Sequence, residues 1–357
     1  MVEKKPVLAK LIAERKKLLT ARMRKYFHTK RLREDQTGAS DAIDRLEAMA
    51  RDGKMLRGMF VIFGFELSGR KITDRVLDAA MAMELTHMAL LVHDDIMDND
   101  QTRRGADAMH VQYTLEGRKK QASVPLHYGQ SQAISIGDIA IFMGLECLGQ
   151  ALVGHSKGGE IMALMGRELE RVGYAQMGDV LFGQTGSEPD EAEILAIYRY
   201  KTAKYSFSLP FLVGGLIGKL DSEILVMLDR LGEEMGIVFQ IRDDELGVFG
   251  DEEKIGKPVG SDIRENKKTL MRYHLYRKAD SRERAKLHGI FGSRGLKAAD
   301  IAYVRNLLDR YNIQEIVGVE SRLHEEKARD ILAKSTLNPD HKQVFSEILR
   351  YVVVREL

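Results

Sequence analysis

Several residue types are scarce in this chain, and each absence narrows its class. Of 357 residues, one is cysteine, six are proline and none is tryptophan. The single thiol, Cys147, excludes an intramolecular disulfide framework and a multi-cysteine zinc site, and it suits a reducing compartment. Proline falls well below its usual ~5% of residues, and this shortage favours a helical protein.

Net charge is also nearly absent. The chain has 55 Lys and Arg residues against 53 Asp and Glu residues, which leaves +2. Nucleic-acid binders usually carry a basic excess, so we expect no nucleic-acid partner. With 44% hydrophobic residues, the chain has the composition of a globular protein rather than of a disordered one.

Long hydrophobic runs are missing as well. No window reaches ~18 uninterrupted apolar residues, and the longest apolar stretch, 209–217, is broken by one proline and two glycines. The N-terminal segment is rich in Lys and Arg and lacks the apolar region of a signal peptide. The sequence therefore predicts a cytoplasmic protein that is not transmembrane, with a basic helix over residues 1–33.

Hydrophobic residues recur with a period of about 3.6 residues along most of the chain, as they do in amphipathic helices. Alternating patterns typical of strands are short and rare, and no Pro- or Ser-rich linker divides the sequence. We therefore predict a single all-α domain over residues 1–357. The expected helices cover residues 73–98, 138–152, 160–182, 191–217, 222–248, 262–278, 297–311, 313–335 and 339–355.

An acidic cluster ends the expected helix 73–98. Asp94 and Asp98 are four residues apart, so they project from one helix face, where two carboxylates repel each other. Acidic groups are also unfavourable at the negative end of the helix dipole. A cation between the two carboxylates would relieve both penalties, and oxygen ligands of this kind suit Mg²⁺ that bridges to a phosphate.

A second acidic cluster, Asp243 and Asp244, follows another long apolar run. The two clusters are far apart in sequence, but in an all-α fold they could face each other across a bundle of helices. Facing acidic helix ends are one way to build a site for several metal ions.

Basic residues accompany both clusters. Arg103 and Arg104 follow the first cluster, and their guanidinium groups match the oxygens of a phosphate. Lys54 and Arg57 are three residues apart and share one helix face. Two diphosphates with Mg²⁺ would require cations of this kind on both sides of the acidic groups. The remaining candidates are Lys201, Lys257 and Lys267.

The order of these motifs resembles that of the trans (all-E) isoprenyl diphosphate synthases, over residues 53–272. The segment 249–265 is most similar to the archaeal-type geranylgeranyl diphosphate synthases. The motifs are Gly-Lys-x-x-Arg at 53–57, His-x5-His-Asp-Asp-x-x-Asp at 87–98, Arg-Arg-Gly at 103–105, Lys-Thr at 201–202, Gln-x-Arg-Asp-Asp-x-x-Gly at 240–247 and Gly-Lys-Pro-x-Gly-Ser-Asp at 256–262.

This resemblance implies an all-α bundle of the isoprenoid-synthase type around a central cavity, assembled as a homodimer. It implies a prenyltransferase that condenses isopentenyl diphosphate with an allylic diphosphate, using three Mg²⁺ ions. The implied metal ligands are Asp94, Asp98 and Asp243, supported by Asp95 and Asp244.

The resemblance also implies how the substrates are held. The allylic diphosphate would be bound by Arg103, Lys201, Lys257 and, as a further candidate, Lys267. Isopentenyl diphosphate would be bound by Lys54, Arg57, His87 and Arg104. The implied catalytic residues are Lys201, Thr202 and Gln240, of which Thr202 and Gln240 would lie near the developing carbocation.

Three positions depart from the family pattern, and two others bear on product length. Gly58 stands where the family often has proline, Asp52 stands where a second glycine is common, and Gly247 replaces a third aspartate of the second cluster. In this family, a bulky aromatic residue four or five positions before the first aspartate usually stops the growing chain early. Ala89 and Leu90 occupy those positions here, so we expect a product of C20 or longer.

Three other functions compete with this interpretation. A non-catalytic subunit of a heteromeric prenyl synthase tends to lose the acidic motifs, which this chain keeps. A class I terpene cyclase shares the acidic helix ends but needs no second diphosphate pocket. A metal phosphohydrolase built on His93 and Asp94 would need further histidine ligands in order. The sequence does not indicate a preferred primer or a role for residues 280–357.

Overall fold

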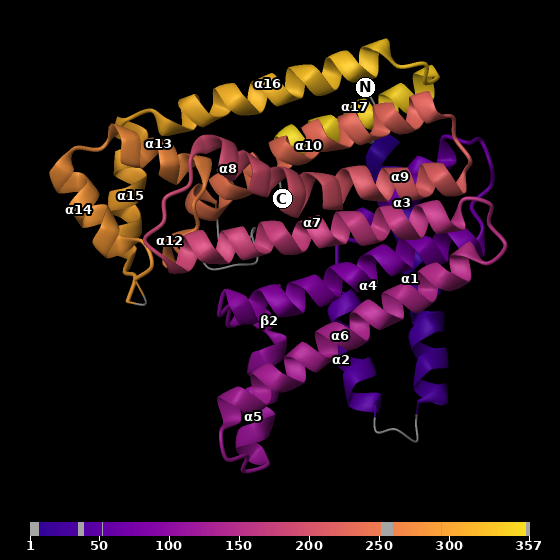
Figure 1. Cartoon of the computed structure of the whole chain (residues 1–357), viewed down its shortest axis with the longest axis horizontal. Coiled ribbons are helices and arrows are strands. Elements are labelled where there is room, and N and C mark those ends of the chain that lie inside the picture. The colour runs from indigo at the N-terminus through magenta and orange to yellow at the C-terminus, as the bar shows by residue number, and fades with distance from the viewer. Residues whose placement is uncertain (1–6, 35–38, 52, 251–259, 294, 355–357) are drawn as a thin grey trace, which may run out of the picture. The chain divides into compact units, whose positions relative to one another are not determined.

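The computed structural model describes residues 7–34, 39–51, 53–250, 260–293 and 295–354. In these segments the chain is helical apart from one short antiparallel hairpin, β1 (Thr102–Arg103) and β2 (Ala106–Asp107). Figure 1 shows the helices in chain order from indigo to yellow. The all-α prediction is therefore confirmed.

The internal contacts divide the chain into two compact units, which are described separately. The first unit comprises residues 1–163 and 210–225, and the second comprises residues 164–209 and 226–357. Both units are discontinuous in sequence, because the chain leaves the first unit and returns to it once. The prediction of a single domain over 1–357 stays a prediction.

The first unit is built around α4, which carries the first acidic cluster at its C-terminal end. α4 packs against α3, α6 and α1. Its central residues are almost all buried, and Leu85 has no exposed surface. The helices of this unit are α1 (Val7–Arg33), α2 (Ser40–Arg51), α3 (Leu56–Glu66), α4 (Asp74–Met97), α5 (Met109–Lys119), α6 (Pro125–Leu152) and, after the chain returns, α9 (Leu209–Ile217).

Glycines allow α6 to approach α4 closely. A Cβ atom on Gly137 would lie 2.1 Å from His93 Nε2, and one on Gly144 would lie 2.8 Å from Thr86 Oγ1. Such distances leave no room for a side chain at either position. At these two positions the backbone of α6 packs directly against side chains of α4. This close packing holds α4 in the core of the unit.

The second unit gathers the rest of the helices. α7 and α10 cross into it from the first unit, and a wide π-helical segment, η2, follows α8. Wide turns of this kind are frequently found at functional sites. The elements are α7 (Gly158–Gln184), α8 (Glu191–Ile197), η2 (Tyr198–Ser208), α10 (Ser222–Phe249), α12 (Ser261–Arg264), α13 (Leu270–Lys278), α14 (Ser281–Ile290), α15 (Ala298–Arg310), α16 (Ile313–Lys334) and α17 (Pro339–Val354).

One hydrophobic cluster joins most of these elements. It runs from Ile194 on α8 through Ile241 on α10 to Leu275 on α13 and Val317 on α16. The C-terminal region is tied to α10 as well, because His324 Nδ1 lies 2.5 Å from Glu234 Oε2. Residues 280–354 thus form part of the body that supports the second acidic cluster.

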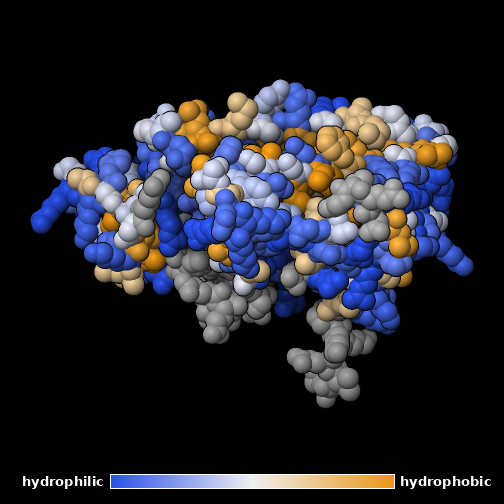
Figure 2. All heavy atoms as spheres, turned by 90° about the horizontal axis from the view of Figure 1, so that it is seen from below, coloured by the Kyte–Doolittle hydropathy of each residue, from blue (hydrophilic) through white to orange (hydrophobic). Residues whose placement is uncertain are grey.

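Two helices, α4 and α6, are long and apolar enough to cross a membrane by length and composition alone. In α4, 72% of the apolar window is buried in the protein, and in α6, 44% is buried. Hydrophilic side chains predominate on the face of the molecule in Figure 2, with hydrophobic ones scattered among them. Burial of most of its apolar window marks α4 as a core helix of the first unit.

Candidate functional site

The first acidic cluster occupies the last turn of α4. The helix continues to its C-cap Asp98, whose N–H donates to the carbonyl oxygen of Asp94 at 2.8 Å. Asp94 and Asp98 therefore stand one turn apart, as their spacing predicts, and both side chains are partly exposed. Two neighbouring, hydrated carboxylates match the ligands that Mg²⁺ accepts while it keeps several waters.

Asp95, unlike its two neighbours in the cluster, is buried and bonded to Arg103. Its side chain is buried, and its Oδ1 accepts a hydrogen bond from Arg103 Nε at 2.7 Å. Arg103 Nη2 also donates to Asp100 Oδ2 at 2.9 Å. Burial raises the pKa of Asp95 to about 6, although the charge of Arg103 opposes that shift. Asp95 thus holds the arginine beside the two exposed carboxylates.

The hairpin directs the two adjacent arginines to different partners. Arg104 and Gly105 form its turn, with positive φ angles of 54° and 79°. The Arg104 guanidinium donates from Nη1 to the Met49 carbonyl at 3.1 Å, next to the start of the loop that carries Lys54. It lies 3.3 Å from the position that a Cβ would take on Gly53. Arg104 is therefore part of the same neighbourhood as the Gly-Lys-x-x-Arg motif.

His87 and Arg57 belong to this neighbourhood too. Loss of hydration lowers the pKa of His87 well below its usual range, and the charges of Arg57 and Arg104 lower it further. The imidazole is consequently neutral at pH 7 and lies among positive charges. Lys54 is exposed in the loop just before α3. The first unit thus brings together the four residues expected to bind isopentenyl diphosphate.

Glu84, which sequence reasoning missed, lies on α4 and interacts with Arg57, Gly58 and Arg104. It lies fully inside the protein on α4, and its Oε1 accepts the N–H of Gly58 at 2.7 Å. Burial raises the pKa of Glu84, while that N–H and the charges of Arg57 and Arg104 favour the ionised form. Its position in the sequence, one turn before His87 on a helix full of apolar residues, was the available signal.

The second acidic cluster divides into an exposed and a buried carboxylate. On α10, the side chain of Asp243 is exposed to solvent, whereas Asp244 is buried. Asp244 accepts hydrogen bonds from the hydroxyl of Tyr198 and from Gln240 Nε2, the latter at 2.8 Å. Thr202 in turn donates to Gln240 Oε1 at 2.6 Å. The structure therefore connects Thr202, Gln240 and Asp244 directly.

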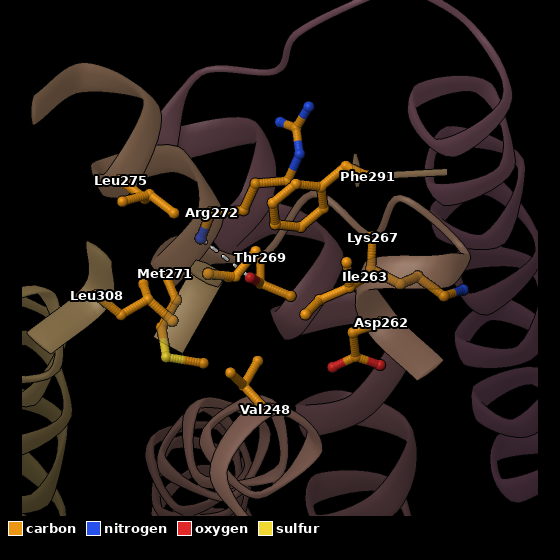
Figure 3. A pocket seen from close by; sticks show the side chains of 11 residues that line it. Val248, Asp262, Ile263, Lys267, Thr269, Met271, Arg272, Leu275, Phe291 and Leu308 are labelled. Carbon is orange, nitrogen blue, oxygen red and sulfur yellow. Dashed lines mark hydrogen bonds between the residues drawn. The ribbon is translucent and has the colours of Figure 1, made fainter. Parts of the chain in front are cut away.

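The missing third aspartate has a steric explanation. A Cβ on Gly247 would lie 2.5 Å from Asp262 Oδ2. Asp262 comes from α12, and Figure 3 shows its carboxylate close to Val248 at the end of α10. The Asp262 carboxylate thus occupies the space next to this turn of α10, so a side chain at position 247 would require Asp262 to move.

The lysines of the second unit converge on Asp179, another residue that sequence reasoning missed. Lys201 Nζ lies 2.6 Å and Lys267 Nζ 3.0 Å from Asp179 Oδ2. Burial alone would raise the pKa of Asp179, but the two lysine charges lower it to about 2. A single acid within the apolar run of α7 was the only signal for it. Lys257 lies outside the described residues.

The positions expected to limit product length lie on α4, one turn before the first cluster. Ala89 is fully buried and Leu90 is partly exposed. In the described part of the chain, no three His, Cys, Asp or Glu side chains form a ready-made metal site. Within each unit, the carboxylates with some solvent exposure are oxygen ligands of the kind that suits Mg²⁺ shared with a phosphate.

Comparison with known proteins identifies the family. Residues 44–308 match the family described as polyprenyl synthetase. The chain belongs to the polyprenyl synthetase family. It is therefore a prenyltransferase of the trans-isoprenyl diphosphate synthase type, as its motifs predict.

Individual relatives agree with this assignment. The chain is 32% identical to the geranylgeranyl diphosphate synthase of Saccharolobus solfataricus, over 73% of this chain and 74% of that protein. It is 29% identical to the geranylfarnesyl diphosphate synthase of Aeropyrum pernix, over 87% and 92%. A crystal structure of geranylgeranyl pyrophosphate synthase from Corynebacterium glutamicum, complexed with isoprenyl diphosphate and magnesium, superposes with a TM-score of 0.90. It is 25% identical and covers 98% of this chain and 99% of that one.

Proposed function

We propose that this polyprenyl synthetase condenses isopentenyl diphosphate with an allylic diphosphate to give an all-trans polyprenyl diphosphate of C20 or longer. The observation that carries the proposal is the pairing of carboxylates with cations in each unit. Asp94 and Asp98 adjoin the Asp95–Arg103 pair, and in the second unit Lys201 and Lys267 both bind Asp179. Relatives named geranylgeranyl and geranylfarnesyl diphosphate synthase support the product range.

The proposed metal ligands are the exposed or partly exposed carboxylates, Asp94, Asp98 and Asp243, for three Mg²⁺ ions per site. When bound, these ions would stabilise the negative charge of a departing diphosphate. Asp95 and Asp244 would support them through their hydrogen bonds to Arg103 and to Gln240. Arg103, Lys201, Lys257 and Lys267 would bind the allylic diphosphate.

The reaction follows from these positions. The C1–O bond of the allylic substrate breaks, and its electron pair leaves with the diphosphate. The double bond of isopentenyl diphosphate then attacks the allylic cation and forms the new C–C bond. A proton is finally lost, and the released diphosphate can accept it. Thr202 and Gln240 would present oxygen atoms near the cation, from which water must be excluded.

Isopentenyl diphosphate needs a site of its own so that its double bond is held near the cation. We propose Lys54, Arg57, His87 and Arg104 for this role. The neutral His87 among arginines creates a positive pocket, and a bound diphosphate would compensate that charge. This second pocket distinguishes a synthase from a class I terpene cyclase, which has no use for it.

The decisive test is product formation from defined substrates. The enzyme is incubated with Mg²⁺, farnesyl diphosphate and labelled isopentenyl diphosphate, and the products are separated by chromatography. We expect labelled products of C20 or longer and release of diphosphate that depends on isopentenyl diphosphate. Diphosphate release without isopentenyl diphosphate would indicate a hydrolase or cyclase, and a product limited to C15 would contradict the proposed length.

Product length provides a first mutational prediction. Ala89→Phe places a bulky ring one turn before Asp94, where Ala89 has no exposed surface. We expect the main product to shorten by at least one C5 unit because the ring blocks the growing chain. Leu90→Phe, at a partly exposed position, tests the same layer with less risk to folding, and Met97→Phe at the exposed end of α4 is the control. Unchanged length in both folded variants would place the limiting layer elsewhere.

A homodimer is the second part of the proposal that can be tested separately. On α6, the apolar side chains of Ile134, Phe142 and Leu145 are exposed, and Phe142 is 66% exposed. An apolar stripe of this kind on a soluble protein marks an interaction site, and a second copy of the same helix is self-complementary. We propose that two chains associate through this face.

We expect Phe142→Glu to weaken self-association so that a monomer predominates at micromolar concentration. Light scattering coupled to size-exclusion chromatography measures the mass directly. Val319→Glu is the matched control, because Val319 is 57% exposed on α16, a helix of the second unit. A wild-type monomer, or a Phe142→Glu dimer as tight as the wild type, would overturn the proposed interface.

The cytoplasm is the proposed location. The only cysteine, Cys147, is a buried free thiol, and burial raises its pKa to about 12. A thiol of this kind remains reduced and unreactive, in keeping with a reducing compartment.

A further inference from the structure

A buried tyrosine hydroxyl connects the second acidic cluster to the loop that carries Lys267. Tyr198, at the start of η2, is 5% exposed. Its hydroxyl donates to the carboxylate of Asp244 and accepts the N–H of Leu270, at 3.0 Å. The hydroxyl therefore bonds to a side chain of α10 and to the backbone of α13 at once.

The accepting side of this hydroxyl fixes the start of α13. Leu270 is the first residue of that helix, and the first N–H groups of a helix have no partner within it. Thr269 caps the same turn by accepting the N–H of Arg272 at 3.2 Å, the bond drawn in Figure 3. Lys267 lies three residues before Leu270 and binds Asp179. The position of this lysine thus depends on where α13 begins.

The donating side fixes the orientation of Gln240. Gln240 Nε2 donates to Asp244 Oδ1 at 2.8 Å, so the amide nitrogen of Gln240 faces Asp244. The amide oxygen must then face Thr202, whose hydroxyl donates to it. The lone pairs of the Thr202 hydroxyl remain available for another group. One continuous chain of hydrogen bonds therefore runs from the α13 backbone to Thr202.

We propose that Tyr198 is a positioning residue that holds Asp244, and through it Gln240 and Thr202, in register with the start of α13. This inference rests on the proposed function, because Asp243, Gln240 and Lys267 are its proposed metal-binding, cation-stabilising and diphosphate-binding groups. Tyr198 touches no substrate in this role. Its hydroxyl keeps three elements, η2, α10 and α13, in one geometry.

The test compares two tyrosines that both donate to a carboxylate. Tyr198→Phe removes the hydroxyl at the site, and Tyr311→Phe removes one that donates to Glu283 Oε2 at 2.6 Å, between α15 and α14. Groups that orient metal ligands typically contribute ~10–100-fold to activity or metal affinity. We therefore expect Tyr198→Phe to lower kcat about tenfold or more and to raise the Mg²⁺ concentration for half-maximal activity about fivefold.

Binding of isopentenyl diphosphate provides the readout that a general loss of stability would not reproduce. Its KM should stay within about twofold in Tyr198→Phe, because its proposed pocket lies in the first unit. Tyr311→Phe should match the wild type in kcat, in the Mg²⁺ concentration for half-maximal activity and in the KM for isopentenyl diphosphate. If Tyr198→Phe does not fold, Asp244→Asn interrupts the same chain and should show the same split between kcat and KM.

The outcomes separate the two proposals. If the wild type forms no prenyl product, the proposed function fails. If the wild type is active and folded Tyr198→Phe keeps its kcat and Mg²⁺ dependence, only the role of Tyr198 is overturned. Equal losses in Tyr198→Phe and Tyr311→Phe would likewise reduce Tyr198 to a core residue. A double-mutant cycle of Tyr198→Phe with Asp244→Asn should be non-additive, because both changes interrupt one chain.

Discussion

Replacing Asp94 and Asp243 together by asparagine is expected to lower kcat by at least about 10³-fold, which corresponds to ~4 kcal/mol of transition-state stabilisation. Asparagine keeps the shape of each side chain but removes the charge that would attract Mg²⁺. The two residues belong to different units, so each single variant tests one of the two acidic clusters. Product formation at saturating Mg²⁺ and substrates is the measurement.

The stability of the same variants makes this prediction specific. Asp94 lies one turn from Asp98 at the C-terminal end of α4, where like charges at this spacing cost ~0.2–0.5 kcal/mol. Removing one charge should leave the free energy of unfolding of the metal-free protein unchanged or slightly higher. Asp107→Asn, at an exposed position in β2, is the control for a neutral surface change. Activity that survives in the folded double variant would refute the metal assignment.

The acidic clusters were predictable because their signal is local. A pair of carboxylates four residues apart on an apolar helix stands out in the sequence, and the structure places Asp94 and Asp98 on adjacent turns as expected. The long helices were predictable for the same reason: hydrophobic periodicity indicates 73–98 and 222–248, and the structure has Asp74–Met97 and Ser222–Phe249. These features depend on spacing within one helix.

Breaks and unusual turns within helical stretches were not predictable in this way. The expected helix 262–278 is wrong, because α12 ends at Arg264 and α13 begins at Leu270. Asn266 has a positive φ of 57° between them, and Thr269 caps the new helix. The expected start at residue 138 is wrong too, since α6 begins at Pro125. Periodicity reports an apolar face and is insensitive to where the backbone turns.

Contacts between segments far apart in the sequence could not be predicted either. Asp179, Tyr198 and Glu84 gain their importance from partners 22 to 88 residues away in the chain, such as Lys201 and Lys267 for Asp179. In the sequence Glu84 and Asp179 are single acidic residues in apolar stretches, and Tyr198 begins a run of polar and charged residues, 198–202. Their partners become apparent only when α7, η2 and α13, or α3 and α4, are packed together.

Gly58 shows how such a contact changes the meaning of a departure from the family pattern. The family often has proline at this position, and proline is well tolerated in the first turn of a helix such as α3. Here, however, the N–H of Gly58 donates to the buried Glu84 at 2.7 Å. A side chain would also meet Leu19 Cδ2 at 2.5 Å and the Ala80 carbonyl at 3.0 Å. The glycine is therefore required by its surroundings.

We expect Gly58→Pro to lower the free energy of unfolding by about 3 kcal/mol, because it leaves a buried carboxylate oxygen without its donor and overpacks the site. Denaturant unfolding measures this loss. Gly58→Ala is the matched control: it keeps the N–H, so it should cost less. The double variant Gly58→Pro with Glu84→Met should recover part of the loss, since replacing both partners of a buried hydrogen bond costs less than leaving one partner unsatisfied.

A Gly58→Pro protein as stable as the wild type would show that the N–H of Gly58 is dispensable. Equal losses for proline and alanine would instead assign the whole effect to steric overlap with Leu19 and Ala80.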